Sequence, residues 1–276
     1  MMNGKTDFNI LTDGFDGRYS YEEHCSNKTF FRHFHDNYEI LFLTNVKGDY
    51  VIENHKYSLM PYDILLIKPT KYHYLLIKDN TSYGRFVMNV TPDFLPEELL
   101  NNAFSRGEFF HLGSSSPVTH NFLKLIEYEK MFDKNDFLIM AKALMTENLM
   151  LIAKMDNSES SDDYKYLDEF NTRVIKYIRD NLTAITSLDQ MAAQLYVSKS
   201  TLYHSFKKAM KISIMQYVRN KKVLYAQNLI KSGIRPTKAY TMAGFEDYTT
   251  FYRSYKLFFG HSPGDAQTTS GSSERQ

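Results

Sequence analysis

Two consecutive helix-turn-helix patterns between residues 187 and 263 constrain the fold more than any other feature of this chain. In the first pattern, apolar residues recur on one helical face, and after a two-residue turn Ser198 is a favoured N-cap for a second helix. In the second pattern, Gly244 supplies a turn in which a positive φ causes no Cβ clash, and Asp247 caps the next helix. These signals predict an all-helical domain.

The two patterns are copies of one unit. Superposing Leu202 on Phe251 also superposes Phe206 on Tyr255, which gives an internal repeat of about 49 residues. The apolar pattern of residues 214–231 predicts one long helix between the copies. At 1.5 Å per residue, this helix would hold the two units about 30 Å apart.

The repeated unit resembles the DNA-binding domain of the AraC/XylS family of bacterial transcription regulators. The matching residues are Ala192, Ser198, Phe206-Lys207, Gly244-Phe245, Tyr255-Lys256 and Gly260-His261-Ser262-Pro263. The resemblance implies a sequence-specific regulator that binds double-stranded promoter DNA and is not an enzyme. One departure is Lys211, which stands where the family usually has glycine at a helix end.

The second helix of each unit is expected to enter the major groove of DNA. Leu202 and Phe206 should point inward, so the groove-facing and phosphate-facing positions follow from helical spacing. They are Ser200, Thr201, Tyr203, His204 and Lys207 in the first unit, and Thr249, Thr250, Tyr252, Arg253 and Lys256 in the second. The resemblance implies base contacts by Ser200, Tyr203, His204, Thr249 and Arg253. Arg253 is the strongest candidate because a guanidinium can bridge guanine O6 and N7. The two lysines are placed for phosphates.

The charge distribution agrees with a nucleic-acid partner. Residues 171–267 carry 15 Lys and Arg against 5 Asp and Glu, whereas residues 1–170 carry 17 against 26. A basic module behind an acidic one is typical of a DNA-binding protein with a separate sensing domain. The single cysteine, Cys25, and the absence of a long apolar run indicate a cytoplasmic protein without a membrane partner.

Residues Phe30–Val90 have the period of strands rather than helices. Short β-rich runs separated by turn residues predict six to eight antiparallel strands in a small barrel or jelly roll. This segment resembles the cupin-type sensing domain of many AraC-family members. Before it, residues 1–28 are expected to be a loose arm with one strand near Tyr19–Glu23. After it, residues 92–111 are expected to be irregular, with a short helix starting near Pro96.

Four residues of this segment match the metal-binding pattern of cupins: His33, His35, Glu39 and His73. Because alternate strand residues face the same side, these side chains could converge inside the barrel. Two interpretations stay open. The residues line an effector site without a metal, which is the one we adopt, with no cofactor. Alternatively, they hold a divalent transition metal, and the chain is a metal-dependent cupin enzyme fused to a DNA-binding domain.

Two helices, His120–Met131 and Asp136–Met155, are predicted after the barrel. The second is apolar over more than one face. One face should cover the barrel, and the other, with Leu144 and Leu151, is expected to pair with a second copy of the chain in a homodimer. The alternative is a helix that is fully buried within its own unit.

The sequence thus predicts an α+β multidomain protein: an N-terminal cupin-like β-barrel with dimerisation helices and a C-terminal all-α double helix-turn-helix domain. The expected boundaries are residues 1–155 for sensing and dimerisation, 156–166 for a linker, 167–266 for DNA binding and 267–276 for a disordered tail. We expect an effector-responsive regulator. The barrel's aromatic residues suggest a sugar as effector, a carbohydrate operon as target, and activation through RNA polymerase.

Overall fold

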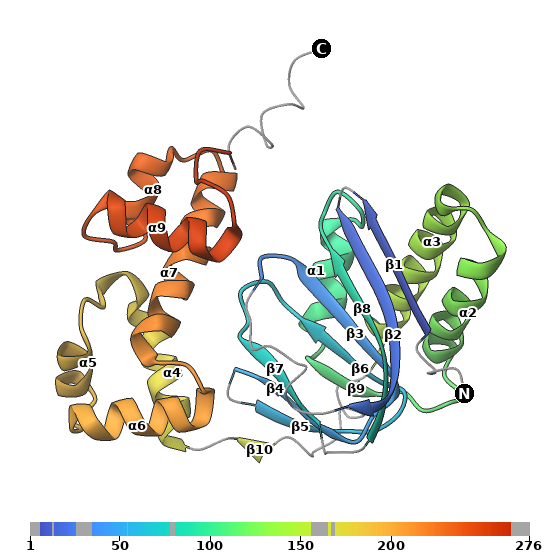
Figure 1. Ribbon diagram of the computed structural model, residues 1–276, viewed down its shortest axis with the longest axis horizontal. Helices are drawn as coiled ribbons and strands as arrows, with labels where there is room; N and C mark the ends of the chain where they lie inside the picture. The colour runs from blue at the N-terminus through green and yellow to red at the C-terminus, as the bar shows by residue number, and fades with distance from the viewer. Residues whose placement is uncertain are drawn as a thin grey trace, which may run out of the picture. The chain divides into compact units, whose positions relative to one another are not determined.

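The computed structural model describes residues 6–12, 14–25, 35–53, 55–77, 81–155, 165–166 and 169–265 of the chain. These residues belong to two compact units, Met1–Lys165 and Tyr166–Gln276 (Figure 1). The first unit is a β-sandwich with helices. In the described part of the second unit, the regular elements are helices, apart from Tyr166 in the two-residue strand β10. The predicted fold class is confirmed. No helix in the described ranges has the length and apolar character needed to cross a membrane. The predicted tail, and all of the predicted linker except residues 165–166, lie outside the described residues.

Two antiparallel sheets form the first unit. One has six strands in the order β1-β2-β8-β3-β6-β9, and the other has four in the order β10-β5-β4-β7. The strands are β1 (Thr6–Thr12), β2 (Phe15–Cys25), β3 (Tyr38–Asn45), β4 (Gly48–Ile52), β5 (His55–Leu59), β6 (Asp63–Ile67), β7 (His73–Ile77), β8 (Thr81–Val90), β9 (Phe109–His111) and β10 (Lys165–Tyr166).

The central strands β3 and β6 of the six-stranded sheet are buried on both faces, because they are apolar at successive positions. In β3, Leu41 and Leu43 face the four-stranded sheet and pack with its apolar side chains. The alternate residue Phe42 faces the opposite side, where it stacks on Phe122 with ring centroids 4.3 Å apart. Three helices cover that side: α1 (Glu97–Ser105), α2 (Pro117–Met131) and α3 (Lys134–Ile152) (Figure 1). Inward-facing residues of β3 therefore point into the space between the sheets.

The N-terminal segment differs from the expected loose arm. Residues Thr6–Cys25 form the hairpin β1–β2, which turns at Gly14 with a φ of 79° and pairs with β8. Phe8 and Phe15 are buried in the core beneath the helices. Strand pairing with β8, whose residues lie 56 to 75 positions further along the chain than their partners in β2, satisfies backbone groups of a segment that is polar in composition. The prediction of an arm was wrong.

Two other expectations for the first unit need correction. Residues 92–111 contain the expected short helix, α1, directly after its N-cap Pro96, but they also contain the strand β9 where an irregular segment was expected. In α3, Leu144 is only 7% exposed and belongs to the unit's own core, and Leu151 packs against that core. The exposed apolar side chains of α3 are instead Ile139 and Met150, at 68% and 58% exposure. A helix that is apolar almost all round gives no sequence signal for which side faces its own sheet.

The second unit contains six α-helices and a 3-10 helix in the described residues. They are α4 (Glu169–Asn181), η3 (Leu182–Ala184), α5 (Leu188–Gln194), α6 (Lys199–Met210), α7 (Ile214–Lys231), α8 (Pro236–Met242) and α9 (Tyr248–Phe259). The predicted caps are in place: Ser187 accepts from the Gln190 amide, Ser198 from the Thr201 amide and Asp247 from the Thr250 amide. Helix α7 has the expected bounds and joins the pairs α5–α6 and α8–α9.

The turns of the two helix pairs differ in length. Between the end of α5 at Leu195 and the cap Ser198 lie two residues, whereas three lie between Ala243 and the cap Asp247. In both turns the residue after the C-cap has a positive φ, 56° at Tyr196 and 78° at Gly244. The repeat is therefore 48 residues long for the first helices and 49 for the second.

Lys211 itself takes the place of the missing glycine at the end of α6. It adopts the left-handed conformation with φ 58° and ψ 11°. This conformation costs a residue with a Cβ roughly 1–2 kcal/mol. A glycine here would avoid that strain, but it would lose more conformational entropy on folding, which offsets part of the gain. We expect Lys211→Gly to raise the free energy of unfolding by about 0.5–1 kcal/mol. Urea denaturation checks this, and a destabilised Lys211→Gly protein would contradict it.

Candidate nucleic-acid interface and ligand site

Helices α6 and α9 each bury one face and expose the other. Leu202 and Phe206 of α6, and Phe251 and Tyr255 of α9, are completely buried. The predicted outward positions lie on the opposite face. Ser200, Thr201, His204, Lys207, Thr249, Thr250, Tyr252, Arg253 and Lys256 are exposed, and Tyr203 is half-buried. The two faces thus present hydroxyl, imidazole, ammonium and guanidinium groups to solvent.

Three of the outward side chains of α6 make contacts within the helix or at its N-cap. Lys207 Nζ donates to the Tyr203 hydroxyl at 3.1 Å and lies 5.4 Å from the ring centroid. The Thr201 hydroxyl lies 2.8 Å from Ser198 Oγ, beside the N-cap. On α9 the Asp247 carboxylate accepts from the Thr250 amide at 2.7 Å, and this hydrogen bond, together with the nearby charge of Arg253, lowers the pKa of Asp247.

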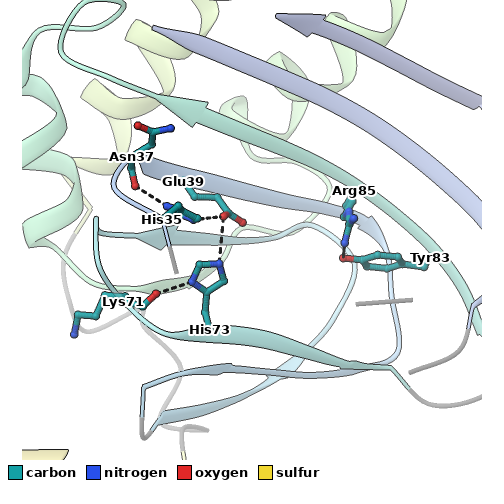
Figure 2. Close-up of polar contacts among 7 residues, drawn as sticks. All are labelled: His35, Asn37, Glu39, Lys71, His73, Tyr83 and Arg85. Carbon is teal, nitrogen blue, oxygen red and sulfur yellow. Dashed lines mark hydrogen bonds and ion pairs between the residues drawn. The ribbon is translucent and has the colours of Figure 1, made fainter. Parts of the chain in front are cut away.

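A second group of polar side chains lies between the sheets of the first unit (Figure 2). His35 Nε2 lies 2.6 Å from Glu39 Oε2, and His73 Nε2 lies 3.3 Å from the same oxygen. Glu39 and His73 are almost completely buried, and the His35 side chain is 16% exposed. Strand β3 supplies Glu39 and strand β7 supplies His73, so the contacts cross from one sheet to the other. His33, the fourth predicted member, lies outside the described residues.

The hydrogen bonds at Nδ1 determine how the two imidazoles face Glu39. His35 Nδ1 donates to the Asn37 carbonyl at 2.9 Å, and His73 Nδ1 donates to the Lys71 carbonyl at 2.8 Å (Figure 2). Because a carbonyl oxygen can only accept, each Nδ1 carries a proton. Each Nε2 attracts the carboxylate only when it also carries a proton, or when a cation lies between them.

The same three residues could hold a divalent metal. Their donor atoms all lie within 4.8 Å of one another. Two imidazoles and a carboxylate are ligands that zinc accepts, and an Nδ1–H bonded to a backbone carbonyl is the usual outer contact of such a histidine. The protonated and the metal-bound arrangements are distinguished by elemental analysis of protein purified without chelator. The first predicts no stoichiometric metal and the second predicts one ion per chain.

Burial and charge act in opposite directions on this group. Burial alone would lower the pKa of His35, but its hydrogen bond to Glu39 and the charge of that carboxylate outweigh burial and raise it. Burial alone would raise the pKa of Glu39, but the two histidines hold it well below its usual range. In the absence of a cation, Glu39 is therefore ionised over the neutral pH range.

Sequence reasoning missed four side chains on the inner faces. Asn89 and Arg85 of β8 lie opposite Glu39 and Leu43 of β3, so they share the inward face. The Asn89 Oδ1 atom is buried and has no hydrogen-bond partner among the described residues. The other members are Tyr50, which stacks on His73, and Tyr83, whose hydroxyl accepts from Arg85 Nη1 at 3.1 Å (Figure 2). Only strand pairing brings these residues together, so no local sequence signal could have identified the group.

Comparison with known proteins gives two matching families of domains. Residues 17–128 match the model of the AraC-like ligand binding domain, and residues 191–269 match that of a helix-turn-helix domain. The Msm operon regulatory protein of Streptococcus mutans is 23% identical over 240 residues, which cover 83% of each chain. The uncharacterized HTH-type transcriptional regulator YbfI of Bacillus subtilis is 24% identical over 223 residues, covering 78% of each chain. The XylDLEGF operon transcriptional activator 2 of Pseudomonas putida is 28% identical over 97 residues, covering 34% of this chain and 62% of the relative.

These relatives are named as regulators, not as enzymes. The two domain models occur in the order that the sequence resemblance implies, with the ligand-binding domain first. One model thus matches the β-rich part of the chain, and the other matches the helical part. The alternative of a metal-dependent enzyme is not supported. The chain belongs to the AraC family of transcription regulators.

Proposed function

We propose that this regulator reads promoter DNA with α6 and α9, and that a small molecule bound between its two sheets controls the response. The observation that carries the first half is the matched pair of exposed polar helix faces above fully buried Leu202, Phe206, Phe251 and Tyr255. A helix-turn-helix places such a second helix in the major groove. With α7 between them, the two helices would enter successive grooves on one side of the duplex.

Footprinting tests the DNA-reading half. A duplex selected in vitro from random sequences by the full chain should show two protected major grooves about one helical turn apart. A selected sequence with a single protected groove would contradict the paired reading. Failure to select any sequence would contradict direct base reading altogether.

For the effector, we propose a polyhydroxylated neutral molecule such as a sugar. Between the sheets, Glu39 and the unpartnered Asn89 Oδ1 can accept hydrogen bonds, and the Arg85 guanidinium can donate them. Sugar hydroxyls both donate and accept, and sugar rings stack on aromatic rings such as those of Tyr50 and Tyr83. His35 and His73 would orient Glu39. By this proposal the target is a carbohydrate operon.

Thermal shift of the full chain with a panel of neutral mono- and disaccharides tests this proposal. At least one sugar should raise the melting temperature, and Asn89→Ala should lose most of that shift because its acceptor is removed. Asn102→Ala, an exposed position on α1, is the matched control and should keep it. If no sugar shifts the transition, or if Asn89→Ala responds like the unmodified chain, the sugar proposal is wrong.

We also propose that two copies pair through the outer face of α3. Ile139, Ala143 and Met150 are exposed and lie at helical spacing on one side of this helix. Ile139→Glu or Met150→Glu should shift the chain toward monomer in sedimentation velocity, because a charge would be desolvated at the interface. Leu257→Glu, at an 84% exposed position of α9, should not. A monomeric unmodified chain at tens of micromolar would contradict pairing.

The output is proposed to be activation through RNA polymerase. The support is the relative from Pseudomonas putida, which is named as an operon activator. Transcription in vitro from a promoter carrying the selected DNA sequence checks this. Lower transcript levels with the regulator than without it would indicate repression instead.

A further inference from the structure

Lys222 is a buried cation at the centre of the helical unit. It lies in the middle of α7 and is 6% exposed. Its Nζ donates to two backbone carbonyls, those of Ile185 and Gly244, each at 2.6 Å. Ile185 immediately precedes the α5–α6 pair, and Gly244 is in the turn of the α8–α9 pair. One ammonium group therefore links the two helix pairs directly, in addition to their covalent connection through α7.

Gly244 provides a second link between the pairs. A Cβ at this position would lie 2.0 Å from the Thr183 carbonyl oxygen and 2.7 Å from its carbon. The turn of the second pair thus packs backbone to backbone against η3, which precedes the first pair. With φ at 78°, this close approach requires glycine. At the equivalent turn of the first pair, Tyr196 is 95% exposed. The close packing on η3 is therefore a feature of the second turn and not of the first.

These contacts change how the two pairs can move. Each pair packs against its own part of α7, and without further links each could tilt and rotate against that helix. Removing the Lys222 ammonium would leave the buried Ile185 carbonyl and the half-buried Gly244 carbonyl without this donor, and the loss at a buried acceptor is costly. The relative orientation of α6 and α9 is therefore held by hydrogen bonds as well as by α7.

We propose that Lys222 is a positioning residue that fixes the spacing between the two DNA half-sites the regulator accepts. The proposal rests on the reading of DNA by α6 and α9. Inserting one base pair between the half-sites rotates the second by about 34–36° around the duplex. A reader whose two helices are held in one orientation cannot follow this rotation, whereas a reader that twists about α7 can.

The test uses Lys222→Met in the full chain, with Lys222→Arg and Lys231→Met for comparison. Lys231→Met makes the same substitution at an exposed position of α7. Fluorescence anisotropy measures affinity for the duplex selected by the unmodified chain, for versions with one base pair added or removed between the half-sites, and for each isolated half-site.

The unmodified chain and Lys231→Met should lose at least about tenfold in affinity when the spacing changes, because simultaneous engagement is lost. Lys222→Met should lose less than about threefold, and its affinity for isolated half-sites should be unchanged. Lys222→Arg, which keeps donors and charge, should restore the spacing penalty. This recovery separates positioning from a general loss of stability.

An unchanged spacing penalty in Lys222→Met overturns the proposal. If Lys222→Met fails to fold by circular dichroism, Gly244→Ala takes its place, since a Cβ there must move the second pair away from Thr183. Unchanged spacing dependence in Gly244→Ala would then overturn it. If the unmodified chain binds the full duplex no better than one half-site, the two-groove reading fails, and that outcome is distinct from a failure at Lys222.

Discussion

Replacing Glu39 by alanine is expected to lower the free energy of unfolding of the β-rich unit by about 3–5 kcal/mol, the range for removing one partner of a buried ion pair. Glu39 is 3% exposed, and one of its oxygens faces both His35 Nε2 and His73 Nε2. Without it, two imidazoles whose ring centroids are 4.9 Å apart would face each other in the interior. The polar contact that Glu39 makes with His73 of the other sheet would be lost with it.

Hydrogen exchange at the backbone amides of β3 and β7 in the full chain, followed across a urea series, measures the free energy of unfolding of the β-rich unit separately from that of the helical unit. Asp49→Ala is the control. Asp49 pairs with Lys56 at 2.9 Å on the surface of the same unit, and such exposed pairs contribute about 0–1 kcal/mol. Equal effects of the two substitutions would show that the buried group contributes no more than an ordinary surface pair.

Arg253→Ala should cost about 1–3 kcal/mol of DNA-binding free energy and relax the preference at one base pair. Arg253 is exposed on α9, two residues from Phe251 and from Tyr255 and therefore on the face opposite these buried side chains. An arginine on a groove-facing helix can donate two parallel hydrogen bonds to guanine, so its loss removes discrimination as well as affinity. Binding titrations on the selected duplex, on each single-base variant of it and on scrambled DNA measure both quantities.

Lys207→Ala is the comparison for Arg253→Ala. A phosphate contact carries no sequence information, so this substitution should weaken binding to selected and scrambled DNA alike and reduce the salt dependence by about one charge. Its bond to Tyr203 already directs the ammonium along α6 rather than toward a base. An Arg253→Ala protein that lost affinity equally for both DNAs would contradict base reading by this residue.

The helical unit was predictable because its signals are local. Ser187, Ser198 and Asp247 cap helices three residues before the amides they accept from, and a 3.6-residue apolar period is visible within one helix. The bounds of α7 followed from the same pattern. Lys222 was not identified, since a lysine in an amphipathic helix reads as a surface residue until the carbonyls of Ile185 and Gly244 are placed beside it.

The β-rich unit was predictable in class but less so in detail. Strand alternation over Phe30–Val90 indicated a small antiparallel barrel or jelly roll, and the structure has two facing sheets there, between which His35, Glu39 and His73 converge. The hairpin β1–β2 was missed because it is stabilised by pairing with the distant β8. Asn89 was missed for the same reason, as its position opposite Glu39 depends on strand register. The inward orientation of Leu144 depends on the packing of α3, which the sequence leaves undetermined.

The unequal turns of the two helix pairs have a consequence for promoter architecture. One pair has a two-residue turn open to solvent at Tyr196, and the other has a three-residue turn packed on η3 at Gly244. The outward residues of α6 and α9 differ as well. A single protomer therefore has no internal twofold axis, and we expect the sequence it recognises not to be a palindrome. Each bound protomer would therefore have a defined orientation along the duplex. Inverting its binding sequence would reverse that orientation relative to the direction of transcription.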